Sequence, residues 1–203
     1  MLRTFTVTES TLVLLKRLQQ IPILCNLRLV GGTALALQLG HRNSVDLDLF
    51  GVNDKTLKQI SNELNSKGFN VIPERESGTI KIIWVDGVKV DIVGSYHEWI
   101  NPPIETEGVK MATLQDIAAM KLHAITGRGK KKDFIDFYFL LKHFSLEQII
   151  EFYQKKYPQN SLFFVIKSLS YFNDAEIDPM PTMFIDVSWE EMKSTIRSAI
   201  ENF

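Results

Sequence analysis

The sequence predicts an α/β lobe over residues 1–110 followed by a helical lobe over residues 111–203. In the first half, short segments with the two-residue period of strands alternate with segments that have helical periodicity. From about residue 111 the pattern is almost entirely helical. The loop at residues 101–103, Asn-Pro-Pro, is a natural break between the two halves.

The elements of the first lobe follow in order from periodicity and turn residues. The predicted helices span 9–20, 33–39 and 54–66, and the predicted strands span 27–30, 45–49, 69–73, 79–85 and 88–93. Ser10 is a candidate N-cap of the first helix, and Gly40 and Gly68 are expected to end the next two. Asp86-Gly87 joins the last two strands and is a strong hairpin signal.

The second lobe is divided by turn residues and prolines into helical segments. Its predicted helices span 114–127, 132–144, 146–156, 161–173 and 188–202. The aromatic residues between 134 and 141 are expected to form its core.

Composition is that of an ordinary globular protein. Apolar residues make up 45% of the chain, which can supply a sizeable core. The single cysteine, Cys25, excludes an internal disulfide and fits a reducing compartment. No apolar run approaches 18 residues, and residues 1–6 lack the core of a signal peptide. We therefore expect a cytoplasmic protein with no membrane partner.

Charge is unevenly distributed along the chain, although the net charge is only −1. Residues 121–156 contain eight Lys or Arg and four Asp or Glu. A local basic surface of this kind can bind phosphate or RNA. The alternative, solvated faces of ordinary helices, is equally compatible with the pattern.

Two aspartates, Asp46 and Asp48, are the first candidates for chemistry. In the alternating segment 45–49, both carboxylates are expected on one strand face, about 6.5 Å apart, with Val45, Leu47 and Leu49 on a core face. Two like charges at that distance repel by about 2–3 kcal/mol at an effective dielectric near 20. The pair is therefore either screened by water on an exposed face or holds a hard cation such as Mg²⁺.

A glycine turn precedes these aspartates. Gly31, Gly32 and Thr33 lie between a predicted strand and a predicted helix, where backbone N–H groups and the positive helix end favour an anion such as a triphosphate. Alone, such a turn is more often only a turn, and it matches neither a Walker A loop nor a dinucleotide fingerprint. A phosphate-binding turn followed by two carboxylates on one face nevertheless supplies the two parts that phosphoryl transfer needs, one to hold the phosphates and one to hold Mg²⁺.

Asp91 is a candidate third carboxylate. It lies on the predicted strand 88–93, on the face opposite Val88, Val90 and Ile92. If this strand neighbours the first acidic strand, Asp91 joins Asp46 and Asp48 in a two-metal site. The alternative is a strand aspartate that faces solvent.

Polar residues between the glycine turn and the aspartates are further candidates. His41 and Arg42 are placed either to meet phosphates or to pair with Asp46. Ser44 is a candidate to bind the nucleotide and to cap or orient the loop.

A second group of charged residues lies in the helical lobe. Lys121 and Arg128 are seven residues apart and share one helix face, while Asp133 and Asp136 are i, i+3 neighbours on the next helix. The alternative for the two aspartates is local pairing with residues 130–132, and Lys121 alone is more often a solvated lysine.

Two blocks of the sequence resemble the AbiEii/AbiGii-type nucleotidyltransferase toxin family of the DNA polymerase β-like nucleotidyltransferase superfamily. Residues 31–50 read GGTALALQLGHRNSVDLDLF, and residues 121–137 read KLHAITGRGKKKDFIDF. The similarity extends over about residues 28–141, and the chain after residue 145 carries no such motif. The resemblance implies a mixed sheet flanked by helices, with a helical lobe that completes the active site.

The resemblance also implies a reaction, transfer of a nucleoside monophosphate from an NTP with Mg²⁺ and release of pyrophosphate. Gly32 and Thr33 would contact the triphosphate, Asp46 and Asp48 would bind two metal ions, and Asp91 would help to activate the acceptor hydroxyl. In the later block, Lys121 would reach the nucleotide phosphates, and Asp133 or Asp136 would complete the motif.

The sequence is compatible with three functions. The first is the toxin of a toxin–antitoxin or phage-defence system that modifies tRNA or another acceptor and has a cognate antitoxin. The second is a non-enzymatic nucleotide- or partner-binding module of the same fold. The third is a nucleotidyltransferase that modifies a small molecule such as an antibiotic.

Overall fold

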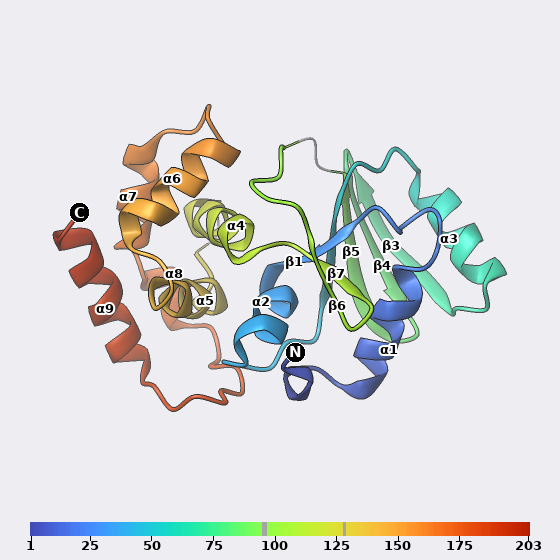
Figure 1. Cartoon of the computed structure of the whole chain (residues 1–203), viewed down its shortest axis with the longest axis horizontal. Coiled ribbons are helices and arrows are strands. Elements are labelled where there is room, and N and C mark those ends of the chain that lie inside the picture. Colours follow the sequence, from blue (N-terminus) through green and yellow to red (C-terminus); the bar gives the residue numbers. More distant parts are fainter. Residues whose placement is uncertain (95–96, 128) are drawn as a thin grey trace. The chain divides into compact units, whose positions relative to one another are not determined.

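The computed structural model describes residues 1–94, 97–127 and 129–203 (Figure 1). Contacts divide the chain into two compact units. The first contains residues 1–38, 44–96 and 103–112, and the second contains residues 39–43, 97–102 and 113–203. A mixed sheet with helices and a helical C-terminal part confirm the predicted fold class.

Within the described residues, seven strands of the first unit form one sheet in the order β3-β4-β5-β2-β1-β7-β6. The strands are β1 (Arg28–Val30), β2 (Leu47–Gly51), β3 (Val71–Ser77), β4 (Ile80–Val85), β5 (Val88–Gly94), β6 (Ile104–Thr106) and β7 (Val109–Met111). β2 is parallel to β5 and β1 is parallel to β7, whereas the other neighbours are antiparallel. The predicted strand that carries Asp91 is therefore a neighbour of the strand that carries Asp48.

The predicted hairpin at Asp86-Gly87 is confirmed. Val85 and Val88 are paired across the end of β4 and β5, with φ of 49° at Asp86 and 82° at Gly87 between them. Two consecutive residues with positive φ are what a two-residue hairpin loop of type I′ requires. This tight turn fixes the register of β5 against β4.

Two parts of the sheet differ from the prediction. β2 begins at Leu47, so Asp46 lies just ahead of the strand, and Val45 is 59% exposed instead of lying in the core. The backbone there is held by loop contacts, because the N–H of Ser44 donates to the carbonyl oxygen of Thr6. In addition, the short hairpin of β6 and β7 was not predicted.

The helical segments of the N-terminal half are η1 (Thr4–Thr6), α1 (Glu9–Leu18), α2 (Gly31–Leu39) and α3 (Leu57–Ser66). Thr8, and not Ser10, caps α1 by accepting a hydrogen bond from the N–H of Thr11. α3 begins three residues later than predicted because Thr56 and Gln59 form a capping box. α2 begins at the glycine turn itself, two residues earlier than predicted.

Figure 1 shows α1 and α3 on one side of the sheet and α2 on the other. Fully buried side chains of the central strands pack on one sheet face: Leu29, Leu47, Leu49, Val90 and Ile92. Because side chains alternate along a strand, Asp48 and Asp91 leave from the opposite face. The start of α2 lies on this same face, since Gly31 is in contact with Asp48.

The second unit contains α4 (Leu114–Gly127), α5 (Lys131–Leu141), α6 (Leu146–Lys156), α7 (Leu162–Leu169), α8 (Asn173–Glu176) and α9 (Trp189–Glu201). α4 packs against α5, α6 and α7, and α9 packs against α5 and α7. Phe134 and Phe137 are fully buried, as predicted for the aromatic segment. Within the described chain, no helix is both long and apolar enough to cross a membrane.

The helix predicted at 161–173 is too long, because α7 ends four residues earlier and the separate helix α8 begins only at Asn173. α7 ends at Leu169, where the Ser170 hydroxyl donates to the carbonyl oxygen of Lys167. Phe172 then turns into the core, with its ring 4.8 Å from that of Phe134 and 5.9 Å from that of Trp189. The free energy gained by burying this aromatic side chain exceeds the free energy that a longer helix would contribute.

Candidate active site

Asp48 and Asp91 are partners in the register of the parallel strands β2 and β5. Neighbouring strands lie about 4.8 Å apart, and partner residues project from the same face, so the two carboxylates are adjacent. Asp46 lies two residues before Asp48, at the entrance to β2. We call Asp46, Asp48 and Asp91 the acidic row.

Gly31 brings the start of α2 against this row. Its φ is 67°, in the left-handed region, and a Cβ at this position would lie 2.1 Å from Oδ2 of Asp48. Glycine is therefore required both by conformation and by space. The N–H groups of the first helical turn, which includes Gly32 and Thr33, have no partner within a helix and carry its positive end.

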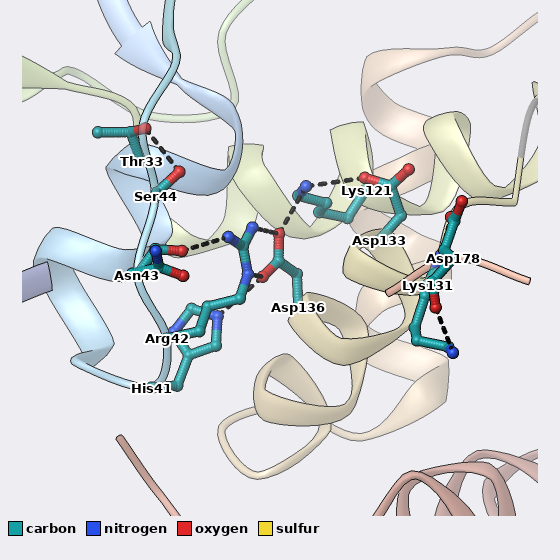
Figure 2. A network of polar contacts seen from close by, with 10 residues as sticks. All are labelled: Thr33, His41, Arg42, Asn43, Ser44, Lys121, Lys131, Asp133, Asp136 and Asp178. Carbon is teal, nitrogen blue, oxygen red and sulfur yellow. Dashed lines mark hydrogen bonds and ion pairs between the residues drawn. The ribbon is translucent and has the colours of Figure 1, made fainter. Parts of the chain in front are cut away.

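Thr33 fastens the loop that leads to β2. Its buried hydroxyl donates to the carbonyl oxygen of Asp46 and lies 2.8 Å from the hydroxyl of Ser44, as Figure 2 shows for the latter pair. Thr33 and Ser44 were both predicted to bind nucleotide. In the structure the two side chains hold the loop that leads to β2.

Lys89 is a member of the site that the sequence prediction missed. Its Nζ lies 2.9 Å from Oδ1 and 3.0 Å from Oδ2 of Asp91. Burial lowers the pKa of Lys89, but the hydrogen bond to Asp91 and the charges of Asp91, Asp46 and Asp48 outweigh burial and raise that pKa. All three predicted carboxylates thus act on one ammonium. The two-residue spacing of Lys89 and Asp91 on one strand was a signal that could have revealed it.

The donors of the acidic row suit a hard divalent cation. Carboxylate oxygens are the ligands that Mg²⁺ prefers, and Oδ1 of Asp91 is buried without a well-formed hydrogen bond among the described residues. In the described chain, no three His, Cys, Asp or Glu side chains already converge closely enough to enclose a metal ion. The donors therefore fit the ion in chemistry, and binding requires the side chains to draw together.

A second group of predicted residues meets around Asp136 in the second unit (Figure 2). Arg42 donates to both Asp136 oxygens, from Nε at 2.7 Å and from Nη2 at 2.8 Å, and Nε2 of His41 lies 2.8 Å from Oδ1. Nζ of Lys121 lies 2.6 Å from Oδ2 of Asp136 and 2.9 Å from Oδ1 of Asp133. We call these five residues the Asp136 cluster.

The Asp136 cluster is buried and electrostatically coupled. Burial raises the pKa of Asp136, but the charges of Arg42 and Lys121 and the hydrogen bonds from His41 and Arg42 hold that pKa well below its usual range. Burial lowers the pKa of Lys121, and the charges of Asp136 and Asp133 raise it by more. The Lys121 side chain is only 7% exposed, and its ammonium lies between these two carboxylates.

The basic segment 121–156 is less basic at the surface than its composition suggests. Lys121, Lys131 and Lys156 are buried. Lys131 donates to the carbonyl oxygens of Glu176 and Asp178 instead of pairing locally with Asp133 or Asp136. The exposed lysines of the segment are Lys130, Lys132, Lys142 and Lys155. Arg128, which was predicted to share a helix face with Lys121, lies outside the described residues.

A further buried ion pair joins α4 to α6 and was not predicted. Nζ of Lys156 lies 2.9 Å from Oδ1 of Asp116 and donates to the carbonyl oxygen of Glu98. Asp116 also accepts hydrogen bonds from the N–H groups of Ile100 and Asn101. This pair anchors residues 97–102, and its partners lie too far apart in sequence to be matched by spacing.

Comparisons with known proteins place the chain in a family. A family model described as "Nucleotidyl transferase AbiEii toxin, Type IV TA system" matches residues 13–202. An uncharacterised protein of Aquifex aeolicus, aq_aa25, is 34% identical over 191 residues, which cover 89% of each chain.

Solved structures share the fold at low sequence identity. JHP933 from Helicobacter pylori has a TM-score of 0.57 and is 18% identical, with 97% of this chain and 94% of that chain covered. MenT4, a nucleotidyltransferase toxin from Mycobacterium tuberculosis, has a TM-score of 0.55 and is 14% identical, with 92% and 82% covered. The family match confirms the resemblance found in the sequence: the chain belongs to the AbiEii nucleotidyltransferase toxin family and is a nucleotidyltransferase.

Proposed function

We propose that the protein transfers a nucleoside monophosphate from an NTP to a hydroxyl group of tRNA, with Mg²⁺ held by Asp46, Asp48 and Asp91. The observation that carries this proposal is the register pairing of Asp48 with Asp91 beside the glycine start of α2. It combines carboxylate oxygens suited to Mg²⁺ with a helix N-terminus suited to phosphate. These are the two parts that phosphoryl transfer needs.

The proposed mechanism gives the residues different tasks. The N–H groups of Gly31, Gly32 and Thr33 bind phosphate oxygens of the NTP at the positive end of α2. Bound Mg²⁺ supplies neutralisation of the charge that develops during transfer. The acceptor oxygen forms a bond to the α-phosphorus, the bond from that phosphorus to the pyrophosphate oxygen breaks, and the Asp91 carboxylate accepts the hydroxyl proton.

The catalytic and nucleotide-binding roles predicted for Arg42, Ser44, Lys121, Asp133 and Asp136 stay predictions. The contacts of the Asp136 cluster support a structural contribution, because its charges already neutralise one another in a buried setting. A Lys121→Met variant separates the two roles. A raised KM for NTP with an unchanged melting temperature supports phosphate binding, whereas a lowered melting temperature with an unchanged KM supports a structural role.

We extend the proposal to two macromolecular partners. The exposed lysines of segment 121–156 favour an anionic acceptor such as tRNA. The family is described as part of a type IV toxin–antitoxin system, which supports a cognate antitoxin that opposes the activity. Expression of the wild-type protein is then expected to arrest growth, and Asp46→Ala is expected to relieve that arrest.

An acceptor screen tests this proposal. Purified protein is incubated with each of four α-labelled NTPs and with total cellular RNA, a protein extract or an aminoglycoside antibiotic. Label on tRNA supports the proposal, and label only on the antibiotic indicates a small-molecule transferase. NTP binding by calorimetry without transfer to any acceptor indicates a non-enzymatic module.

A further inference from the structure

The acidic row is accompanied by a cation of the protein itself. Lys89 and Asp91 both project from the site face of β5, and the Lys89 ammonium lies within 3.0 Å of both Asp91 oxygens. Their side chains are only 29% and 24% exposed, so water screens this contact less than it screens a surface ion pair.

Charges from two strands converge on this ammonium. Asp91 lies on its own strand, and Asp46 and Asp48 belong to the neighbouring segment at β2. The Lys89 ammonium touches Asp91, and the negative charges of Asp46 and Asp48 also act on it. One ammonium cannot balance three carboxylates, so the acidic row keeps an excess of negative charge that favours a divalent cation.

We infer that Lys89 is the counter-ion of the acidic row in the metal-free protein and that Mg²⁺ displaces its ammonium from Asp91. The inference rests on the proposed function, in which the acidic row holds the metal. An ammonium that lies against both oxygens of Asp91 and a metal ion bound to those oxygens would occupy the same space. Among the described residues, Oδ1 of Asp91 has no well-formed hydrogen bond, so release of the lysine costs this carboxylate the hydrogen bond to Oδ2 and the ion-pair contact to Oδ1.

Displacement of Lys89 is expected to couple the binding of the metal to the binding of the NTP. The released ammonium remains next to the site on a flexible four-carbon stem and needs a new anionic partner. The triphosphate of an NTP supplies anionic oxygens beside Gly31. Metal and NTP binding are therefore expected to strengthen each other, and part of this coupling depends on Lys89.

Mn²⁺ binding to the full-length protein tests the inference without measuring catalysis. Calorimetry compares the wild type with Lys89→Met, Lys89→Gln and Lys89→Arg, and with Lys58→Met, an exposed lysine on α3, as a matched control. Removing one positive charge about 5 Å from a divalent ion is expected to tighten Mn²⁺ binding by at least about tenfold, the size of the effect with the full screening of bulk water. Lys89→Arg and Lys58→Met are expected to bind Mn²⁺ like the wild type.

Melting in the presence of a chelator gives an independent readout. Lys89→Met and Lys89→Gln are expected to melt below the wild type when metal-free, because the carboxylates then repel one another, and saturating Mn²⁺ is expected to remove that difference. Unchanged or weaker Mn²⁺ binding in both variants overturns the inference, as does an unchanged melting temperature of the metal-free variants. If Asp48→Asn and Asp91→Asn bind Mn²⁺ like the wild type, the metal site of the proposed function itself is wrong.

Discussion

The carboxylate of Asp48 occupies the space that a side chain on residue 31 would need. A Cβ built on Gly31 would lie 2.1 Å from Oδ2 of Asp48, and the residue has a φ of 67°. A glycine at this position lets a carboxylate of the sheet approach the first turn of α2. The contact links the two motifs, the glycine turn and the aspartates, that the sequence places 17 residues apart.

Gly31→Ala is expected to reduce activity by more than the conformational strain of the alanine alone would explain. A left-handed φ at a non-glycine residue costs about 1–2 kcal/mol, and the added methyl group must also push Asp48 aside. Gly68→Ala is the matched control, because Gly68 has a φ of 84° and no atom of the described part of the chain lies within 4 Å of the added Cβ. Transfer rates and urea unfolding are measured for both variants. Equal activity in the two variants would contradict the structural role of the Gly31–Asp48 contact.

Asp48→Asn and Asp91→Asn are each expected to reduce kcat/KM for nucleotidyl transfer by about a hundredfold or more. Each change removes a negative charge at the proposed metal site while leaving the side-chain shape. Asp54→Asn serves as the control, since the Asp54 side chain is 78% exposed in the same unit. Steady-state kinetics with saturating Mg²⁺ provide the comparison, and near wild-type activity in either site variant would exclude that carboxylate from the mechanism.

Asp136→Asn is expected to lower the free energy of unfolding by about 3–5 kcal/mol, because it leaves the buried charges of Arg42 and Lys121 without their shared partner. Glu63→Gln is the control, since the Glu63 carboxylate forms a long, exposed ion pair with Lys67 at 4.0 Å. Chemical denaturation measures both. A loss no greater than that of the control would show that the Asp136 cluster does not stabilise the second unit.

The contribution of Asp136 to stability is expected to depend on pH in the acid range. Its pKa in the folded protein lies well below the value of about 3.9 in an unfolded chain. The stabilisation is therefore fully present above about pH 4, and is lost as the pH falls toward the native pKa, because the unfolded state then takes up a proton that the native state does not. Urea unfolding from pH 7 to 2.5 should show the gap between wild type and Asp136→Asn narrowing below about pH 4. A gap that stays constant over this range would contradict the assignment.

Asp116→Asn tests the second buried ion pair. The change leaves the Lys156 ammonium buried without its carboxylate and weakens the acceptor for residues 100 and 101, so we expect a loss of about 3–5 kcal/mol in the free energy of unfolding. Glu190→Gln removes the exposed partner of Lys193 and is expected to change stability little. If the two variants unfold at the same denaturant concentration, the Asp116–Lys156 pair contributes no more than a surface pair.

Local signals predicted the elements that depend on neighbouring residues. Asp86-Gly87 specified its hairpin because both residues tolerate the positive φ of the turn. The alternating strands around Asp48 and Asp91 were predicted because one face is apolar. Element ends were less predictable: Thr8 caps α1 although Ser10 was an equally suitable residue type.

The partners within the site depended on contacts that sequence spacing does not encode. Asp136 pairs with Arg42, which lies 94 residues away in the sequence. Spacing alone therefore could not show whether Asp136 pairs with residues 130–132, or whether Arg42 contacts a phosphate. Lys89 was different, because its two-residue spacing from Asp91 already placed it on the acidic face. It was missed because a lysine on a strand is usually solvated.

Isotope position in the transferred group tests the central claim most directly. The protein is incubated with Mg²⁺, tRNA and an NTP labelled at either the α- or the γ-phosphate, with Asp48→Asn and Asp54→Asn in parallel. We expect α-label on tRNA, γ-label only in released pyrophosphate, and loss of both signals in Asp48→Asn but not in Asp54→Asn. Transfer of γ-label to tRNA, or full α-label transfer by Asp48→Asn, would contradict nucleotidyl transfer at the acidic row.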